Sequence, residues 1–458
     1  MERVVADTWQ DGITGAPQPP KAAGLPLLGS VIPMAKDPIH FLVDQYRELG
    51  PIFKVQALHR NFTILAGPQA NLFMTKHGDK YLSGRDSWTT FADEVDSQYF
   101  MAAIDGKVHK QMRSIIKKPY SRQNLLSKIP DVVQTVDTFT QGWGAGDSFS
   151  TFSKMQVLIA DQIGTLLLGH GPGEYFSDFA YFMRTILNAV LGQRPKLSLK
   201  MPGYLHAKAR VMELANNMIE AHRANPNPPE DHDIIDFLLK AQVTDPELMT
   251  EPEIVLATLG PYLAGIDTAA GTLAFVLYAL FKNPEVIERL VPEIDAAFAE
   301  GPPDSKALRG MHILHGVILE SMRLYPVAPM LPRHVVEPFE FAGHQLNVGD
   351  PVMLANGVAH FDGAIYKDPD RFDIDRILDP RKEHRQPGAF APYGLGAHTC
   401  AGAGFAEVEI MVTIATLFHR FELSMAPADY ELKRVFNPSP APTKEFQFNI
   451  VKRRHDAS

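Results

Sequence analysis

A mostly apolar stretch from Thr250 to Phe281 constrains the fold of this chain more than any other segment. Thr250 and Glu253 have the spacing of a capping box, which predicts that a helix begins here, and Asn283-Pro284 would end it. Such a helix is roughly 45 Å long, because each residue adds about 1.5 Å. It would cross a whole domain, so the remaining chain has to pack around it.

A membrane span is the alternative, because Ile254 to Phe281 contains one charged residue, Asp267. The pairs Gly260-Pro261 and Asp267-Thr268 argue against a span, as do the acidic residues before the stretch and the few cations after it. A single span in mid-chain would also divide the protein between two compartments. The sequence therefore favours a buried core helix.

The 458 residues show no break in composition, and 45% of them are apolar, which is ordinary for a protein with a large core. We expect residues 1 to about 30 to be a proline-rich tail without regular structure and residues 31–458 to form a single domain. The net charge of −9 argues against nucleic-acid binding. Met1 to Gln10 has no apolar run, so we expect no membrane anchor and a soluble, cytoplasmic monomer.

Helical patterns dominate, and strand signals gather near the start of the chain and after Arg333. A helix is expected around His40 to Leu49. Strands are expected at 52–55, 62–65, 339–341, 345–348, 352–355 and 446–451. The expected fold class is therefore mainly α with small β-sheets, at about 50–70 and 333–360.

Cys400 is the only cysteine, which excludes an internal disulfide, a multi-cysteine metal cluster and covalent haem attachment through a cysteine pair. A buried, inert thiol is the simplest interpretation. However, Gly394, Gly396 and Gly402 flank the sulfur and would let a flat group approach, and an apolar helix follows. The start of a helix favours a thiolate, which could be a metal ligand or a nucleophile with His398 as its base.

The segment from Tyr393 to Gly402 resembles the haem-binding loop of the cytochrome P450 family, F-x-x-G-x-x-x-C-x-G followed by A-x-x-E, with Tyr393 in place of the usual Phe. The matching residues are Gly396, Cys400, Gly402, Ala406 and Glu409. The resemblance implies a P450 fold with non-covalent haem b between the long central helix and the cysteine loop. Cys400 would be the thiolate ligand of the iron, and His398 would reach a haem propionate. The loop residues expected against the haem are Tyr393, Gly394 and Gly402.

The central helix contains Ala264-Gly265-Ile-Asp267-Thr268-Ala269. Small residues would let a flat cofactor or a diatomic ligand approach, and the Thr268 hydroxyl can bond a carbonyl of the preceding turn. An ordinary polar spot is the alternative, although an unpaired Asp267 carboxylate would be costly in so apolar a helix. The stretch resembles the oxygen-binding motif of the P450 family, with Ala269 where a hydroxyl is usual. The resemblance implies that Asp267 and Thr268 deliver protons and that Ala264 and Gly265 contact the haem.

Residues 106–130 contain seven cations and no carboxylate. The cations considered as a docking patch are Lys107, Lys110, Lys117, Lys118 and Arg122. A solvated helix face is the alternative to a site that binds an acidic protein. His109 and Arg113 resemble residues of this helix in P450s that hold haem propionates, with His109 where Trp is common, and Arg333 resembles a further propionate ligand.

Glu320 and Arg323 lie one helical turn apart, which by itself is a common surface ion pair. Their surroundings resemble a P450 helix that carries E-x-x-R, and Phe372 to Arg376 resembles the later F-x-P-E-R segment, with Ile and Asp at its third and fourth positions. The resemblance implies a buried network of Glu320, Arg323 and Arg376 that braces the haem loop.

The resemblance implies a haem-thiolate monooxygenase that inserts one oxygen atom of O2 into a mostly apolar small molecule, such as a steroid, terpenoid or fatty acid. Electrons would come from NAD(P)H through a reductase and a separate ferredoxin- or flavodoxin-like donor. The residues expected to line the substrate pocket, or alternatively to be ordinary core, are Trp88, Phe91, Phe100, Leu259, Leu263, Val327, Met330, Leu331 and Phe436. A sterol demethylase is disfavoured, because Asp267 stands where that subfamily usually has His. A peroxide-driven peroxygenase and a non-catalytic haem-thiolate sensor are the alternatives.

Overall fold

The computed structural model describes residues 9–190, 195–228, 232–436 and 439–456, and its chain divides into two compact units. The sheet unit contains residues 9–89, 102–107 and 328–400. The helical unit contains residues 90–101, 108–327 and 401–456. Each unit has its own core and is described by itself.

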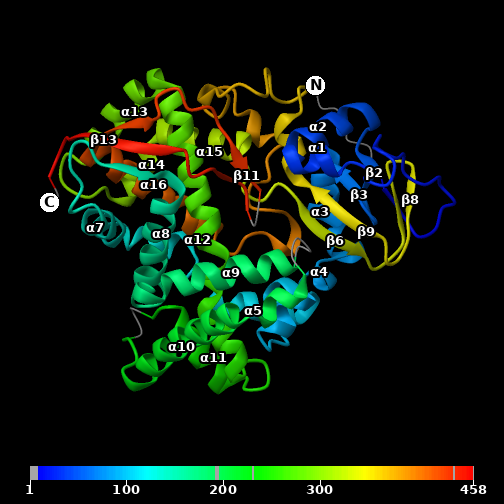
Figure 1. Cartoon of the computed structure of the whole chain (residues 1–458), viewed down its shortest axis with the longest axis horizontal. Coiled ribbons are helices and arrows are strands. Elements are labelled where there is room, and N and C mark those ends of the chain that lie inside the picture. Colours follow the sequence, from blue (N-terminus) through cyan, green and yellow to red (C-terminus); the bar gives the residue numbers. More distant parts are fainter. Residues whose placement is uncertain (1–8, 191–194, 229–231, 437–438, 457–458) are drawn as a thin grey trace. The chain divides into compact units, whose positions relative to one another are not determined.

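The sheet unit is built on a five-stranded sheet in which segments far apart in the sequence lie side by side (Figure 1). The strand order is β2 (Ile52–Ala57), β3 (Arg60–Ala66), β9 (Pro351–Ala355), β6 (Leu331–Val335) and β4 (Leu82–Ser83), and only β3 and β9 pair in parallel. A second sheet has the order β1 (Trp9–Asp11), β7 (Phe339–Phe341) and β8 (His344–Leu346). Phe73, Tyr81, Phe339 and Phe341 stack in the core beneath these strands.

The α-helices of the sheet unit precede its last strand, β9, and a series of 3₁₀ turns follows it. The α-helices are α1 (Val31–Lys36), α2 (Pro38–Leu49) and α3 (Gly67–Tyr81). The 3₁₀ turns are η4 (Asn356–Phe361), η5 (Ile374–Arg376), η6 (Glu383–Arg385) and η7 (Gly396–His398). The chain passes between the two units within α4 (Arg85–Glu94) and α5 (Gly106–Ile116), with η1 (Met101–Ala103) between them.

The helical unit is organised around α12 (Glu251–Lys282), which runs beside α8 (Thr151–Leu167) (Figure 1). Ala269 to Leu280 is buried without a break, because α8, α15 and α16 pack on α12 from several sides. The most apolar 18-residue window of α12 is 72% buried inside the protein. Packing therefore accounts for its apolar character, as the core-helix interpretation predicts. One further described stretch, Gly396–Arg420, is long and apolar enough to span a membrane, and it is 67% buried.

The remaining elements of the helical unit are smaller. Its other α-helices are α6 (Arg122–Leu126), α7 (Ile129–Phe139), α9 (Phe176–Val190), α10 (Pro202–Ala224), α11 (Ile234–Thr244), α13 (Pro284–Ala297), α14 (Ser305–Gly310), α15 (His312–Leu324) and α16 (Ala403–Arg420), with 3₁₀ turns η2 (Gly173–Tyr175) and η3 (Lys196–Lys200). One sheet has the order β10 (Phe421–Ala426), β13 (Gln447–Arg453) and β5 (Ser148–Ser150), and β11 (Arg434–Val435) pairs with β12 (Ala441–Pro442).

The predicted dominance of helix, the predicted helix near 40–49 and all six predicted strands are confirmed within a few residues. The structureless tail is wrong at β1, which pairs with β7 and so adds a strand to a sheet formed 330 residues later in the chain. Strand β6 was not predicted. Its sequence, Leu331-Pro-Arg-His-Val335, has a proline inside it, and proline removes a backbone donor and weakens a strand signal.

The predicted capping box at α12 is wrong. Thr250 is the N-cap residue, but its side chain makes no capping hydrogen bond. The Glu253 carboxylate instead accepts hydrogen bonds from Ser97 Oγ at 2.7 Å, Gln98 N at 2.7 Å and Tyr99 N at 3.0 Å. Three donors from a neighbouring loop satisfy this buried carboxylate better than the single N–H of its own N-cap. Glu253 therefore anchors residues 97–99 to the first turn of α12.

Candidate active site

The sheet unit presents the single cysteine on a tight loop. The Cys400 N–H donates to the Tyr393 carbonyl at 2.8 Å and closes the loop around η7. Gly394 and Gly396 have φ of 74° and 71°, the left-handed region that favours glycine. A Cβ on Gly396 would also lie 3.2 Å from the Met74 carbonyl oxygen. Backbone geometry therefore fixes the loop and leaves Cys400 exposed at its end.

A buried guanidinium lies in the same unit, on β6. Nη1 of Arg333 donates to the Pro332 carbonyl at 2.8 Å, but Nε has no hydrogen-bond partner. Burial lowers the pKa of Arg333, while the nearby Asp105 and Asp79 oppose this shift. No carboxylate in the described part of the chain lies within ion-pair distance of it. A buried cation with an unused donor is costly unless an anion meets it, so this position fits the carboxylate of a ligand.

His398 and Asp105 form a polar pair at the cysteine loop. His398 Nε2 lies 2.8 Å from Asp105 Oδ1, and Ser83 Oγ donates to the other carboxylate oxygen. These hydrogen bonds, with that of His398 the stronger, hold the pKa of Asp105 below its usual range. Sequence reasoning missed Asp105, which lies 293 residues before His398.

The centre of α12 in the helical unit combines an exposed small residue with a locally bonded hydroxyl. Ala264 is exposed, and Thr268 Oγ1 donates to its carbonyl at 2.7 Å, with the Gly265 carbonyl at 3.3 Å. A Cβ on Gly265 would approach the Ile163 side chain of α8 to 2.7 Å. Glycine is thus required here for helix packing, and Ala264 is the member of the small pair that faces open space.

Asp267 points into a cavity of about 490 Å³ that α8, α9, α12 and the β11–β12 region enclose. Asp267 Oδ1 accepts a hydrogen bond from Gln156 Nε2 at 2.7 Å. Burial raises the pKa of Asp267, and the Gln156 hydrogen bond and the charge of Arg184 oppose the shift. The polar residues that line the cavity with it include Gln156, Arg184, Asn188, Lys444 and Glu445. The cavity is lined mostly by apolar side chains, and these polar groups are the ones through which the carboxyl group can exchange protons.

A fully buried ion pair on α15 has the predicted residues. Arg323 Nε and Nη2 each donate to one oxygen of Glu320 at 2.8 Å, and both side chains have 0% exposure. In the sheet unit, Arg376 Nη1 donates to Glu383 at 2.9 Å and to the Lys367 carbonyl at 2.8 Å. Glu383, which sequence reasoning missed, is the carboxylate partner of Arg376 in that unit. The network of all three predicted residues stays a prediction.

A model of the family described as cytochrome P450 matches residues 17–449. The chain belongs to the cytochrome P450 family. It is similar to a putative cytochrome P450 120 of Synechocystis sp., with 25% identity over 97% of this chain and 99% of the relative. It is also similar to a putative cytochrome P450 136 of Mycobacterium tuberculosis, with 25% identity over 92% and 86% of the two chains. Among solved structures, retinoic acid-bound cyanobacterial CYP120A1 matches 95% of this chain with a TM-score of 0.82 and 23% identity, covering 99% of that chain.

This P450 is a monooxygenase, an oxidoreductase with a haem-thiolate cofactor. The fold class predicted from the sequence is confirmed by the structural match. Three features of its own residues fit a haem. The thiol of Cys400 is exposed on a rigid loop, Arg333 offers a buried cation to a propionate, and Ala264 leaves one face of α12 open.

The other predicted propionate contacts of this P450 lie on α5. His109 is buried and Arg113 is half-buried, one turn apart on the helix. Their contacts with haem, like those of His398, Tyr393, Gly394 and Gly402, stay predictions.

The five cations of the predicted docking patch differ in their contacts. Lys107, Lys110 and Lys117 are exposed. Lys118 lies over the ring of Phe237 at 5.5 Å, and Arg122 forms an ion pair with Glu407 of α16. In the described part of the chain, Arg122 is therefore the one cation of the patch that is paired with a carboxylate, and the row of three lysines, Lys107, Lys110 and Lys117, makes neither an ion pair nor a ring contact.

The predicted pocket residues of this P450 are divided between the units. The sheet unit holds Trp88, Met330 and Leu331, and the helical unit holds Phe91, Phe100, Leu259, Leu263, Val327 and Phe436. Phe91 and Phe100 stack with ring centroids 4.6 Å apart. Leu263 is the only one of the nine among the described residues that line the cavity beside Asp267.

Proposed function

We propose that this P450 hydroxylates a mostly apolar small molecule of the steroid, terpenoid or fatty-acid type. It uses O2 and electrons that originate from NAD(P)H and arrive through a separate ferredoxin- or flavodoxin-like donor and its reductase. The observation that carries the proposal is Asp267, whose carboxyl group is bonded to Gln156 and lines a cavity that also contains charged side chains such as Arg184 and Glu445. A proton route of this kind is needed when O2 is reduced, whereas a peroxide-driven enzyme receives its oxygen already reduced.

Haem, when bound, supplies the activation of O2 and the oxidation of a C–H bond. Cys400 would hold the iron as a thiolate, and Arg333 would neutralise a propionate, with His109, Arg113 and His398 as further contacts. Ala264 and Gly265 would form the helix surface nearest the cofactor. The predicted network of Glu320, Arg323 and Arg376 would brace the cysteine loop.

Thr268 and Asp267, both on α12, would have different roles in proton delivery. The Thr268 hydroxyl already donates to the Ala264 carbonyl, so its oxygen can accept a hydrogen bond from a further donor on the open side of the helix. Burial raises the pKa of Asp267, so its carboxyl group holds a proton at a higher pH than an ordinary aspartate does and can act as a proton donor. Protons would pass from the cavity to Asp267 and then toward Thr268.

The apolar character of the substrate rests on the stacked rings of Phe91 and Phe100 and on the buried side chain of Leu259, which are among the residues predicted to line the pocket. A protein of the same fold has been solved with retinoic acid, a long apolar molecule with one carboxylate. The residues proposed to contact substrate are Trp88, Phe91, Phe100, Leu259, Leu263, Val327, Met330, Leu331 and Phe436. We further propose a cytoplasmic monomer that docks an acidic electron donor on Lys107, Lys110 and Lys117.

The test begins with the reduced carbon monoxide adduct of the haem-loaded protein. A Soret band of the thiolate-ligated type is expected, and an imidazole-type band would remove Cys400 as the ligand. A ligand-shift screen of steroids, terpenes and fatty acids then selects substrates for turnover. Turnover with O2, NADPH and a ferredoxin system is expected, and Asp267→Asn should slow it by about 100-fold while leaving peroxide-driven turnover unchanged. Activity with peroxide alone would favour the peroxygenase, and substrate binding without any turnover would favour the sensor.

A further inference from the structure

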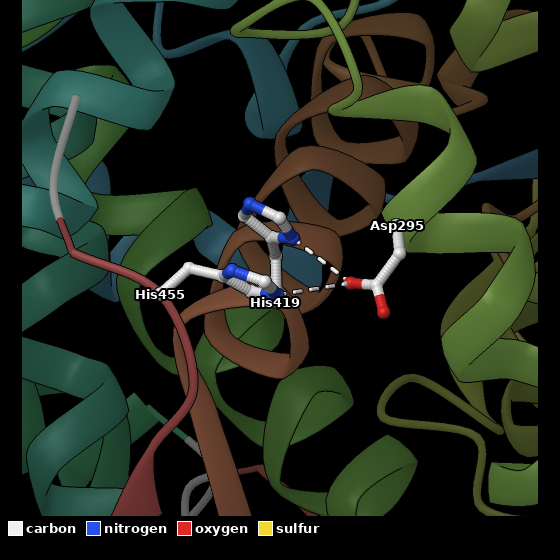
Figure 2. A group of neighbouring side chains, drawn as sticks. All are labelled: Asp295, His419 and His455. Atoms are coloured by element: carbon white, nitrogen blue, oxygen red, sulfur yellow. Dashed lines mark hydrogen bonds and ion pairs between the residues drawn. The ribbon is translucent and has the colours of Figure 1, made fainter.

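Three potential metal ligands meet in the helical unit, and none of them is among the residues assigned to haem binding or proton delivery. Asp295 belongs to α13, His419 to the last turn of α16, and His455 follows β13 near the end of the chain. Figure 2 shows both imidazoles directed at the same oxygen of the Asp295 carboxylate. Two imidazoles and one carboxylate from three separate segments form a donor set that P450 chemistry does not use.

The spacing of the three ligand atoms suits a small cation. Asp295 Oδ1 lies 2.9 Å from His419 Nδ1 and 3.8 Å from His455 Nε2, and all three atoms lie within 4.8 Å of one another. A tetrahedral ion with bonds of about 2.1 Å separates its ligands by about 3.4 Å. The observed distances bracket that value. The His455 contact, in contrast, is too long for a hydrogen bond, so this nitrogen is aimed at a carboxylate oxygen that it does not reach.

Contacts around the ligands hold two of them in place. Arg454 Nη2 donates to Asp295 Oδ2 at 2.6 Å and leaves Oδ1 facing the histidines. The His419 ring is stacked between Phe298 and His455, with centroid distances of 4.4 Å and 4.3 Å. Outer contacts of this kind orient the ligands of metal sites.

One movement is required. The two imidazole rings are only 13° from parallel, and an ion lies in the plane of each ring that binds it, so one ring has to turn. His455 can do so, because its side chain is 48% exposed and follows the last strand. The positive charge of Arg454 on the same carboxylate weakens the attraction for a cation. We therefore expect an affinity on the order of micromolar, below that of a four-ligand structural zinc site.

In a second His–Asp cluster of this unit, hydrogen bonds already occupy the potential ligand atoms. His222 Nδ1 bonds the Met218 carbonyl at 2.7 Å, and its Nε2 bonds Asp233 at 2.9 Å. Asp233 caps α11 and Asp236 completes the capping box. Every ligand atom there already has a hydrogen-bonding role within the fold, whereas His455 Nε2 does not.

We propose that Asp295, His419 and His455 bind one divalent first-row transition-metal ion of the Zn²⁺, Ni²⁺ or Cu²⁺ class, with water in the remaining positions. Mixed imidazole and carboxylate donors favour these ions over Ca²⁺ and Mg²⁺, which take oxygen ligands. The bound ion joins α13, α16 and the segment after β13. It therefore fastens the C-terminal strand to two helices of the core.

The test is titration of Zn²⁺ into the full-length, haem-loaded protein by calorimetry, with metal analysis after dialysis. One Zn²⁺ per chain is expected. His455→Gln and Asp295→Asn should each weaken binding by at least about 10-fold. His206→Gln removes an exposed histidine of α10 outside the cluster and should leave binding unchanged. Absence of stoichiometric binding, or equal binding by His455→Gln and the unmodified protein, would overturn the proposal and indicate adventitious surface binding.

A second measurement does not depend on the folding of the Asp295 variant. Hydrogen exchange of the amides of residues 447–455 should slow when Zn²⁺ is added to the unmodified protein and to His206→Gln, but not to His455→Gln. Unchanged exchange at these amides with Zn²⁺ present would overturn the assignment of the ion to this cluster.

Discussion

Two buried arginines in this P450 have opposite surroundings. Arg323 is completely buried and donates two hydrogen bonds to Glu320, whereas Arg333 is nearly as buried and has no carboxylate within ion-pair distance in the described chain. A guanidinium cannot lose its proton in a protein, so it must be neutralised by a neighbour or by a ligand. The first arginine is therefore part of the architecture, and we propose that the second meets an anionic group of the cofactor.

Glu409 on α16 shows the other solution to a buried charge. It is fully buried, its Oε1 has no partner, and burial raises its pKa to about 8. Unlike an arginine, a carboxyl group can remain neutral by keeping its proton. The three residues thus show three states of a buried ionisable group. Arg323 is paired with a carboxylate, Arg333 has an unused donor that a ligand can fill, and Glu409 is neutral when it keeps its proton.

The largest effect is expected at the paired arginine. Arg323→Met leaves the Glu320 carboxylate buried without its partner and should lower the free energy of unfolding by about 3–5 kcal/mol. Urea unfolding followed by circular dichroism measures this change. Arg309→Met, at an exposed position of α14, is the control and should change stability by less than about 0.5 kcal/mol. A similar small loss in Arg323→Met would mean that Glu320 tolerates isolation.

Arg333→Leu should weaken haem binding without lowering the stability of the apoprotein. Without haem, removing an unpaired buried charge should leave stability unchanged or raise it. With haem, the loss of a charged hydrogen bond of about 1.5–3 kcal/mol should accelerate haem transfer to apomyoglobin by about 10–100-fold. A loss of apoprotein stability as large as that of Arg323→Met would show that Arg333 is structural.

Glu409 predicts a pH dependence of stability with a definite sign. The folded pKa of about 8 lies above the reference value of 4.5, so between these values the folded state binds more protons than the unfolded state. Stability should therefore fall as the pH rises through this window. Glu409→Gln should reduce the fall by at least about 1.4 kcal/mol, the equivalent of one pKa unit. Urea unfolding near pH 5 and near pH 8.5 tests this, and parallel pH profiles for the two proteins would contradict it.

The smallest effect is expected from exposed charges. Lys110→Glu combined with Lys117→Glu should slow reduction by an acidic ferredoxin several-fold at low ionic strength, and the difference should shrink as salt is added. Stopped-flow reduction in carbon monoxide measures the rate. Lys240→Glu on α11 is the matched control, because it changes the same kind of exposed charge away from the lysine row. Equal rates for both variants would remove the docking surface.

Local patterns predicted the parts of this P450 that short sequence segments determine. The turns of the cysteine loop depend on Gly394 and Gly396, which lie within the loop itself. The Glu320–Arg323 pair forms between residues one helical turn apart. Glu383 lies only seven residues from Arg376, but the other missed partners lie far away in the chain, Asp105 at 293 residues from His398 and Gln156 at 111 residues from Asp267. Such pairs depend on how helices and strands pack against one another, and no spacing within a motif encodes them.

The same limit applies to Glu253, whose sequence position indicated a helix cap. A carboxylate at the third position of a helix can bond its own N-cap or a neighbouring loop, and only packing decides between the two. Strand β6 was missed for a comparable reason. Pro332 disfavours a strand locally, but pairing with β9 and β4 outweighs this penalty.

The Glu253 anchor has an evolutionary consequence. Two of the three groups that bind this carboxylate are main-chain amides, those of residues 98 and 99, and every amino acid except proline supplies one. Side chains in the segment leading to Phe100 can therefore diversify, and ligand preference can drift with them, while the attachment of the segment is inherited intact.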